Sequence, residues 1–345
     1  MRRILVTGAT GGLGRNAVQT LLAQGVEVRA TGRNLAVGLE LERMGAQFVP
    51  LDLAIATPQQ VDQLVRGMDT VWHCAALSSP WGPERDFIAA NVTATGQLLR
   101  AAGSQHVAHF IHISTPALYF DYRNRYEVPE TFRPDMFVNA YARSKAMAEK
   151  LVQDAAERHP AMRCVILRPR AIFGPHDQVL IPRLARVIEQ RGGKLPLPHG
   201  GAVTLDITYV DNVVHAMWLA TTHKNLQSGT AFNITNGEAA RLCDILHSLF
   251  CEHLQQPFQI VNVPYRLLAL AARLMQFTSR FTRREPALTP YSIGALSFDM
   301  TLDNAKARKI LGYQPIVSLQ DGIARTAQWM RQEAAAVKLL RERNG

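Results

Sequence analysis

The chain has 345 residues, of which 47% are hydrophobic and 19% are charged, and its formal net charge is +10. No apolar stretch approaches the roughly 20 residues of a membrane-spanning helix, no window resembles a signal peptide, and the four cysteines lack the CxxC pairing of a zinc site. No nucleic-acid-reading module accompanies the positive charge. We therefore expect a cytoplasmic protein with reduced cysteines, no metal and no nucleic-acid partner.

Short apolar runs alternate with helical patterns through the first half of the chain. Strands are predicted at 2–8, 26–32, 46–53, 69–76, 107–115 and 163–174. Helices are predicted at 14–25, 86–103 and 140–159. Strands that alternate with helices indicate a parallel sheet covered by helices on both faces. One more strand and helix are predicted within 203–222, and the region from Gly237 onward is mixed and mostly helical.

The first strand runs directly into a glycine-rich turn, "TGATGGLG", that opens a helix. In a doubly wound sheet this turn passes close to the pyrophosphate of a dinucleotide. Gly8 would allow the tight turn, Gly11 the approach of the phosphates, and Gly14 the packing of the helix on the strand. The helix N-terminus would supply free N–H groups to the anion. The loop expected to hold the cofactor also contains Thr10, Gly12 and Leu13.

These features predict an α/β protein, a Rossmann-type doubly wound parallel sheet with a smaller, mostly helical C-terminal substrate-binding region. We expect the dinucleotide-binding domain to span 1–173 and to be completed by 205–236. The substrate-binding region would comprise 174–204 and 237–345.

The end of the second strand indicates which dinucleotide is bound. NAD enzymes place an acid there for the ribose 2′-hydroxyl, whereas this chain has Gly32 followed by Arg33. A guanidinium suits the 2′-phosphate of NADP, so NADP is favoured over NAD, although Arg33 read by itself could be a solvated surface residue. The other residues expected beside the adenine, ribose and pyrophosphate are Asp52, Leu53 and, within the backbone of 73–77, Ala75.

A tyrosine and a lysine in "YARSK" form the candidate catalytic pair. Tyr141 and Lys145 are four residues apart, which places them on one face of a helix. A nearby ammonium favours the phenolate, so we expect Lys145 to lower the pKa of Tyr141 and let it exchange a proton with a carbonyl oxygen. Lys145 could also hydrogen-bond the nicotinamide ribose. Ser114 or Thr115, at the carboxyl edge of the sheet, would fix the substrate oxygen; the alternative is an incidental surface pair.

Taken together, these motifs resemble the extended short-chain dehydrogenases/reductases of the NAD-dependent epimerase/dehydratase superfamily. The resemblance covers nearly the whole chain, through "TGATGGLG", "HCAA", "NVTATG", "ISTPALY", "YARSK", "LRPRAIFGP", "ITYVDNVVHA" and "DNAKARKILGYQP". "SSPWGPERDFIAANV" and "LRPRAIFGPHD" look most like the branch of 3β-hydroxysteroid dehydrogenases, sterol-4-carboxylate dehydrogenases and 2-alkyl-3-oxoalkanoate reductases. The strand end "VRATGRN" is similar to the NADP-using dihydroflavonol and cinnamoyl-CoA reductases.

The resemblance implies a role for each matching residue. Tyr141 would be the acid/base, Lys145 its activator, and Thr115 the active hydroxyl, with Ser114 kept as the alternative. Further cofactor contacts are implied for Asn91 on the cofactor side, and for Pro169 and the backbone near Ile172 at the nicotinamide carboxamide.

The chain departs from the nucleotide-sugar enzymes of this superfamily at two places. Their dehydratases carry Asp-Glu directly after the active hydroxyl, where this chain has Pro116 and Ala117. Their epimerases favour an acid at the position of Gly32. Both departures favour an oxidoreductase that acts on another substrate. A nucleotide-sugar epimerase or reductase, and an NADP-binding regulatory protein without catalysis, are the alternatives.

The second half indicates the nature of the substrate. The segment 264–284 has five arginines, no acid and many apolar residues, with Arg266, Arg273 and Arg280 on one helix face. This pattern favours a lid over a hydrophobic substrate, with a peripheral membrane contact as the alternative, and the two are compatible. We therefore expect a hydrophobic ketone or secondary alcohol, such as a 3-oxo acid or a steroid-like compound, and we keep a homodimer open.

Overall fold

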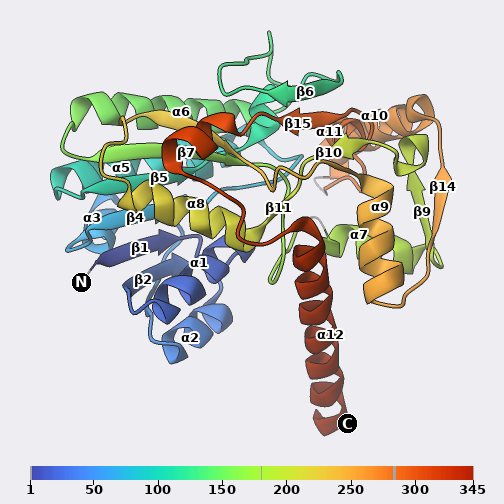
Figure 1. Cartoon of the computed structure of the whole chain (residues 1–345), viewed down its shortest axis with the longest axis horizontal. Helices are drawn as coiled ribbons and strands as arrows, with labels where there is room; N and C mark the ends of the chain where they lie inside the picture. The colour runs from blue at the N-terminus through green and yellow to red at the C-terminus, as the bar shows by residue number, and fades with distance from the viewer. Residues whose placement is uncertain (1, 180, 283–284, 345) are drawn as a thin grey trace.

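A seven-stranded parallel sheet lies at the centre of the structure, a computed structural model that describes residues 2–179, 181–282 and 285–344 (Figure 1). The strand order is β12-β7-β5-β4-β1-β2-β3, and each neighbouring pair is parallel. The strands are β1 (Arg3–Thr7), β2 (Glu27–Gly32), β3 (Gln47–Pro50), β4 (Thr70–His73), β5 (His109–Ile113), β7 (Arg163–Pro169) and β12 (Thr230–Ile234).

Helices cover both faces of this sheet. One face carries α1 (Gly12–Ala23), α2 (Leu35–Arg43) and α8 (Val210–Thr222), and the other carries α3 (Pro58–Val65), α5 (Ala94–Ser104) and α6 (Ala140–Arg158). Because side chains alternate along a strand, Val71 packs into one core and Trp72 into the other. This arrangement confirms the predicted doubly wound α/β fold.

The rest of the chain builds a smaller body of short strands and helices beside the carboxyl edge of the sheet. Three small sheets have the orders β13-β10-β15-β6, β11-β8 and β14-β9. Their strands are β6 (Arg125–Val128), β8 (Ile172–Phe173), β9 (Lys194–Leu197), β10 (Thr204–Leu205), β11 (Thr208–Tyr209), β13 (Ala240–Arg241), β14 (Gln259–Asn262) and β15 (Met300–Leu302). The remaining α-helices are α4 (Glu84–Phe87), α7 (Ile181–Gln190), α9 (Leu242–Leu246), α10 (Tyr265–Thr282), α11 (Pro290–Ala295) and α12 (Leu319–Asn344). Short 3-10 and π turns occupy Ile88–Thr93, Pro116–Tyr119, Pro198–Gly201, His247–His253 and Ala307–Leu311.

The predicted strand within 203–222 does not form as one element. It splits into β10 and β11, which belong to different small sheets. The chain changes sheets at Asp206, which is 3% exposed and whose carboxylate accepts the Leu302 N–H at 2.8 Å. The last strand of the central sheet is instead β12, and the domain bounds given above stay a prediction.

The longest helix of the described residues is α12, which Figure 1 shows extending away from the sheet toward the C-terminus. It is too polar for a membrane interior. None of the helices within the described residues has the length and apolar character needed to cross a bilayer.

Candidate active site

The glycine-rich turn between β1 and α1 is held by close backbone contacts. Gly8 has φ +64°, in the left-handed region that favours glycine, and a Cβ there would lie 2.8 Å from Ala75. A Cβ on Gly14 would lie 2.2 Å from the Gly8 carbonyl oxygen, so the helix can approach the strand only without a side chain. At Gly11 the nearest atom would be 3.4 Å away, which leaves the front of the turn open.

The first turn of α1 faces this open side. Gly11 is its N-cap residue and supplies no side-chain hydrogen bond, and the first turn has no acidic residue. Its N–H groups are therefore suited to an anion. A Cβ on Gly12 would meet the His176 carbonyl at 2.8 Å, and the half-buried Leu13 packs between two cores. The loop fits a pyrophosphate, and the contact itself stays a prediction.

The residues expected at the adenine end lie at the ends of β2 and β3. The Arg33 side chain is 75% exposed, and its Nη1 is 3.9 Å from Oδ2 of Asp52. Asp52 also accepts the Ala54 N–H at 3.0 Å, and Leu53 is buried. Arg33 is therefore held weakly, because an exposed pair at this distance contributes little. It is free to turn toward an anion.

Three hydroxyls meet at the carboxyl edge of the sheet. Tyr141, on the first turn of α6, hydrogen-bonds both Ser78 and Thr115. Thr115 also caps the following 3-10 turn by accepting the Ala117 N–H at 3.1 Å. The Ser114 hydroxyl, by contrast, is buried and finds no hydrogen-bond partner among the described residues. The structure thus brings Thr115, rather than Ser114, to the tyrosine.

The prediction that Lys145 lowers the pKa of Tyr141 is wrong for this structure. Burial raises the pKa of Tyr141, and hydrogen bonds from Ser78 and Thr115 only partly oppose this rise. Lys145 is not a cause of this shift in the pKa of Tyr141. Its amine points instead toward β5, so burial outweighs any help from the cation. A phenol that stays protonated at neutral pH is suited to donate its proton to a carbonyl oxygen.

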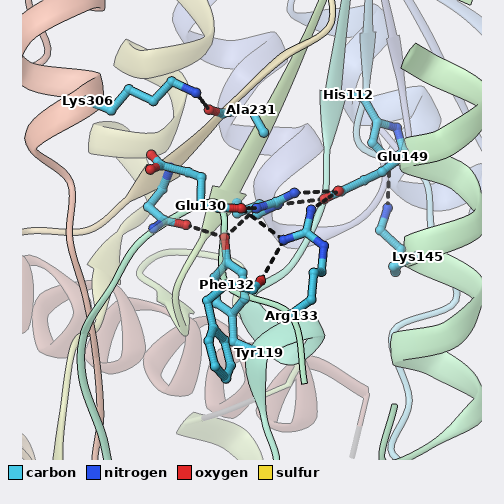
Figure 2. A network of polar contacts seen from close by, with 11 residues as sticks. His112, Tyr119, Glu130, Phe132, Arg133, Lys145, Glu149, Ala231 and Lys306 are labelled. Carbon is cyan, nitrogen blue, oxygen red and sulfur yellow. Dashed lines mark hydrogen bonds and ion pairs between the residues drawn. The ribbon is translucent and has the colours of Figure 1, made fainter. Parts of the chain in front are cut away.

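Lys145 is almost fully buried one helical turn beyond Tyr141. Its Nζ donates to the Ile113 carbonyl at 2.6 Å and lies 3.1 Å from Nε2 of His112, as Figure 2 shows for His112. An ammonium has three donors, so one remains for a further acceptor. Burial lowers the pKa of Lys145 to about 8, although Glu149 acts in the opposite direction.

An ion-pair network fixes α6 against β7 beside this lysine (Figure 2). The Glu149 carboxylate accepts two hydrogen bonds from Arg168, at 2.7 and 2.6 Å, and both side chains are buried. Arg168 also donates to the Tyr119 hydroxyl at 2.5 Å and to the Glu130 carbonyl at 2.9 Å. Arg133 adds a longer contact to Glu149 at 3.7 Å. The network gives each nitrogen of the buried guanidinium a partner and holds the helix that carries the catalytic pair.

A second polar chain runs beneath the expected cofactor position. Asn91 is buried, accepts the Leu77 N–H at 2.7 Å and donates to Ser144 at 2.9 Å, so it ties the segment after β4 to α6. His73 lies between the Thr7 hydroxyl, at 2.7 Å, and the Thr95 hydroxyl, at 2.8 Å. Asn91 therefore supports the cofactor side through the backbone.

The structure adds four residues that the sequence analysis did not select. Ser78 directly follows "HCAAL", and His112 on β5 lies two residues before Ser114, so both could have been found from their position. Arg170 follows Pro169, the last residue of β7, and precedes Ile172 in β8, beside the predicted nicotinamide contacts. Nothing in the sequence singles out Tyr291, on α11, which interacts electrostatically with Tyr141 and Arg170.

The fold and this site define a dinucleotide-binding oxidoreductase of the short-chain dehydrogenase type. The chain belongs to the NAD dependent epimerase/dehydratase family, whose model matches residues 4–235. It is 48% identical over 331 residues to the protein YbjS of Escherichia coli (strain K12), covering 95% of this chain and 98% of that one. It is 31% identical to the 2-alkyl-3-oxoalkanoate reductase of Shewanella oneidensis, with 93% and 84% covered.

The fold is also that of a solved structure. UDP-glucuronic acid 4-epimerase from Bacillus cereus, in complex with NAD, superposes with a TM-score of 0.74 and 24% identity, covering 96% of this chain and 99% of that chain. The predicted superfamily and its reductase branch are confirmed.

Proposed function

We propose that the protein is an NADP-dependent oxidoreductase that transfers a hydride between NADP(H) and a hydrophobic ketone or the matching secondary alcohol. The observation that carries the proposal is the hydrogen-bonded set of Tyr141, Thr115 and Ser78, one helical turn from Lys145 and at the edge where such sheets bind ligands. A 3-oxo acid is the substrate class that the named reductase among the relatives favours. A steroid-like alcohol is also a hydrophobic secondary alcohol and is the other substrate class within this proposal.

The side chains supply proton transfer and positioning. NADPH, when bound, supplies the hydride to the carbonyl carbon, and the Tyr141 phenol gives its proton to the carbonyl oxygen, so that a ketone becomes a secondary alcohol. Thr115 and Ser78 orient the phenol. The free donor of Lys145 would reach the ribose of the nicotinamide, while the open turn at Gly11 would hold the pyrophosphate.

The choice of NADP rests on the end of β2. A Cβ at Gly32 would lie 2.5 Å from the Thr10 hydroxyl, so Thr10 fills the space that an acid would need. Arg33 is next in the chain, and Asp52 holds it only loosely. A guanidinium in this position suits a 2′-phosphate.

A hydrophobic substrate is supported by aromatic rings beside the hydroxyls. Phe120 contacts Tyr291 edge-on at 5.5 Å and Tyr122 at 5.0 Å, and Tyr291 in turn interacts with Tyr141. Helix α10 covers this cluster, since its Tyr265 packs on Phe298 at 5.4 Å. We propose that α10 is the lid of the substrate pocket. Burial of apolar substrate area is then the main source of affinity.

The test is an NADPH-oxidation screen over ketosteroids, 3-oxo acids, aldehydes, quinones and UDP-sugars. We expect turnover of medium-chain or ring ketones, rising with apolar size. Tyr141→Phe should bind NADPH normally and fail to turn over. Activity on UDP-sugars alone would favour the nucleotide-sugar alternative, and tight NADPH binding without turnover of any compound would favour a regulatory protein.

A further inference from the structure

One half-buried cation of the site has no close partner among the described residues. Arg170 follows β7, and its Nε is buried without a hydrogen bond. No ion pair to it is found among the described residues. Arg168, two positions earlier, has a partner for every nitrogen, from Glu149, Tyr119 and a carbonyl. Because a buried N–H group without a hydrogen bond is costly, the Arg170 guanidinium is suited to an anion from outside the chain.

Its surroundings hold one internal counter-charge, and that acid is not in contact with it. Asp206 is the acid that influences Arg170 electrostatically, yet it lies beyond ion-pair distance. Its carboxylate already accepts the Leu302 N–H at 2.8 Å. Tyr291 is the other group that acts on Arg170, and a protonated phenol does not neutralise a cation.

The position of Arg170 connects it to the reaction. Arg170 follows the carboxyl end of β7, and Thr115 follows the carboxyl end of the paired strand β5, so both lie at the same edge of the sheet. Tyr291 interacts electrostatically with both Arg170 and Tyr141. The hydrogen bonds between the neighbouring strands β5 and β7 support this placement. The Ser114 N–H donates to the Leu167 carbonyl at 2.7 Å, close to the points where the two segments leave the sheet. A substrate whose carbonyl meets Tyr141 would therefore present its neighbouring groups to Arg170.

We propose that Arg170 binds a carboxylate of the substrate, which lies close to the carbon that undergoes hydride transfer. This inference rests on the proposed function and narrows it to a 3-oxo acid, or its 3-hydroxy acid, with the apolar part against the aromatic cluster. A guanidinium forms two parallel hydrogen bonds to a carboxylate, so it fixes the orientation as well as the charge. The carboxylate is retained in the reaction, in which the ketone gains a hydride from NADPH and a proton from Tyr141.

The experiment compares a 2-alkyl-3-hydroxyalkanoate with its methyl ester in NADP⁺ reduction. Wild type should prefer the acid in kcat/KM, and Arg170→Gln should remove a preference of about 30- to 5,000-fold, the range for loss of one partner of a hydrogen-bonded charged pair. Arg170→Lys should recover part of it, because a lysine keeps the charge without the fork. Arg123→Gln, an exposed arginine, is the matched control.

A second measurement does not depend on turnover. A 2-alkylalkanoate, which has no reacting oxygen, should bind the NADP⁺ complex of wild type by calorimetry and bind Arg170→Gln at least tenfold more weakly. Equal binding to both would overturn the role of Arg170. If wild type binds this carboxylate through Arg170 but oxidises neither acid nor ester, the inference stands and the proposed function fails. If Arg170→Gln loses UDP-sugar binding and keeps carboxylate binding, the anion is a diphosphate and the inference is wrong.

A separate observation concerns the outer face of α10. Leu267, Leu270, Leu274 and Phe277 are 56–60% exposed and recur every three or four residues, so they form one apolar stripe. Ala272, on the side packed against the protein, is fully buried. Figure 1 shows α10 at the periphery, in the part of the structure farthest from the N-terminus.

Positive charge accompanies this stripe. Arg266 and Arg273 project from the same helix, and the segment 264–284 contains no acid. The side chain of Arg280, the third arginine of the predicted face, lies outside the described residues. We infer that the α10 stripe docks on an anionic lipid surface, because apolar burial and attraction of arginine to lipid phosphate act together there. A lipid surface carries charge of one sign, which matches a helix face with arginines and no acid, whereas a protein partner would not require charge of one sign.

Vesicle co-sedimentation tests this second inference. Wild type should bind phosphatidylglycerol/phosphatidylcholine vesicles at least tenfold more tightly than pure phosphatidylcholine, and 0.5 M salt should weaken the binding. Leu267→Gln/Leu274→Gln and Arg266→Gln/Arg273→Gln should each reduce it at least tenfold, whereas Leu35→Gln, an equally exposed leucine on α2, should not. Absence of binding, or a dimer in sedimentation velocity that the leucine variant dissociates, would refute it.

Discussion

Replacing Lys145 by Met should change how the stability of the protein depends on pH. The ammonium is 1% exposed, and burial lowers its pKa from 10.5 to about 8. Between these two values the unfolded chain holds one proton more than the folded chain, so wild-type stability rises with pH in this window. The penalty of the buried cation is fully present below pH 8 and is gone above the unfolded pKa.

The magnitude follows from the gap between the two pKa values. At about 1.4 kcal/mol per pH unit, the change across the window is about 3 kcal/mol. Met has a similar volume and no charge, so the variant lacks this contribution. Removing the buried charge should raise the free energy of unfolding at neutral pH. Part of this increase is lost, because the Ile113 carbonyl and His112 each lose a hydrogen-bond donor. The variant should be inactive. The buried ammonium therefore lowers the stability of the wild type and is required for its activity.

The assay is urea unfolding of both proteins at pH 7, 8, 9 and 10, followed by tryptophan fluorescence. The stability advantage of Lys145→Met over wild type should shrink steadily above pH 8. Lys150→Met, on the exposed side of the same helix, should show no such change over this range. A constant difference between Lys145→Met and wild type at all four pH values would show that the lysine titrates normally, and the desolvation argument would fail.

Three further outcomes follow from the geometry. Tyr141→Phe should lower kcat by about 10²–10⁴-fold with NADPH affinity unchanged; a loss below threefold would exclude Tyr141 as the proton donor. Gly32→Asp should weaken both NADPH and NADH in fluorescence titrations, because its side chain meets Thr10, and only the double variant with Thr10→Gly should gain NADH; tighter NADH binding by the single variant would contradict this. Glu149→Gln should destabilise the fold by about 3–5 kcal/mol in urea, since Arg168 stays buried without its counter-ion, and Glu149→Leu/Arg168→Met should recover most of the loss unless the pair itself is stabilising.

Sequence could predict those parts of the molecule that backbone sterics impose locally. The spacing of Gly8, Gly11 and Gly14 follows from contacts within a few residues and across one neighbouring strand, so it is visible in the chain. The alternation of strands and helices is equally local, and it led to the correct sheet. By contrast, the change of sheets between β10 and β11 at Asp206 depends on Leu302, almost a hundred residues away. No local sequence pattern predicts it.

The site divides in the same way. The helical spacing of Tyr141 and Lys145 was sufficient to select them, but their pKa values depend on burial and on the direction of the lysine, which only the fold decides. Arg170 and Tyr291 act on each other electrostatically although they are about 120 residues apart, so the spacing of residues in the sequence does not predict this interaction. The choice between Ser114 and Thr115 likewise required the position of α6.

The polar chain through His73 has a consequence for magnetic resonance. The Thr95 hydroxyl donates to the Asn91 carbonyl at 2.7 Å, so its oxygen must accept from His73 Nε2–H. On the other side, the Ala75 N–H donates to the Thr7 hydroxyl, whose own proton therefore goes to Nδ1 of His73. Burial lowers the pKa of His73 to about 3, so one neutral tautomer persists across the working range. Its two ring nitrogens should show widely separated ¹⁵N chemical shifts that do not change with pH. These shifts can serve as an internal reference when other groups of the site are titrated.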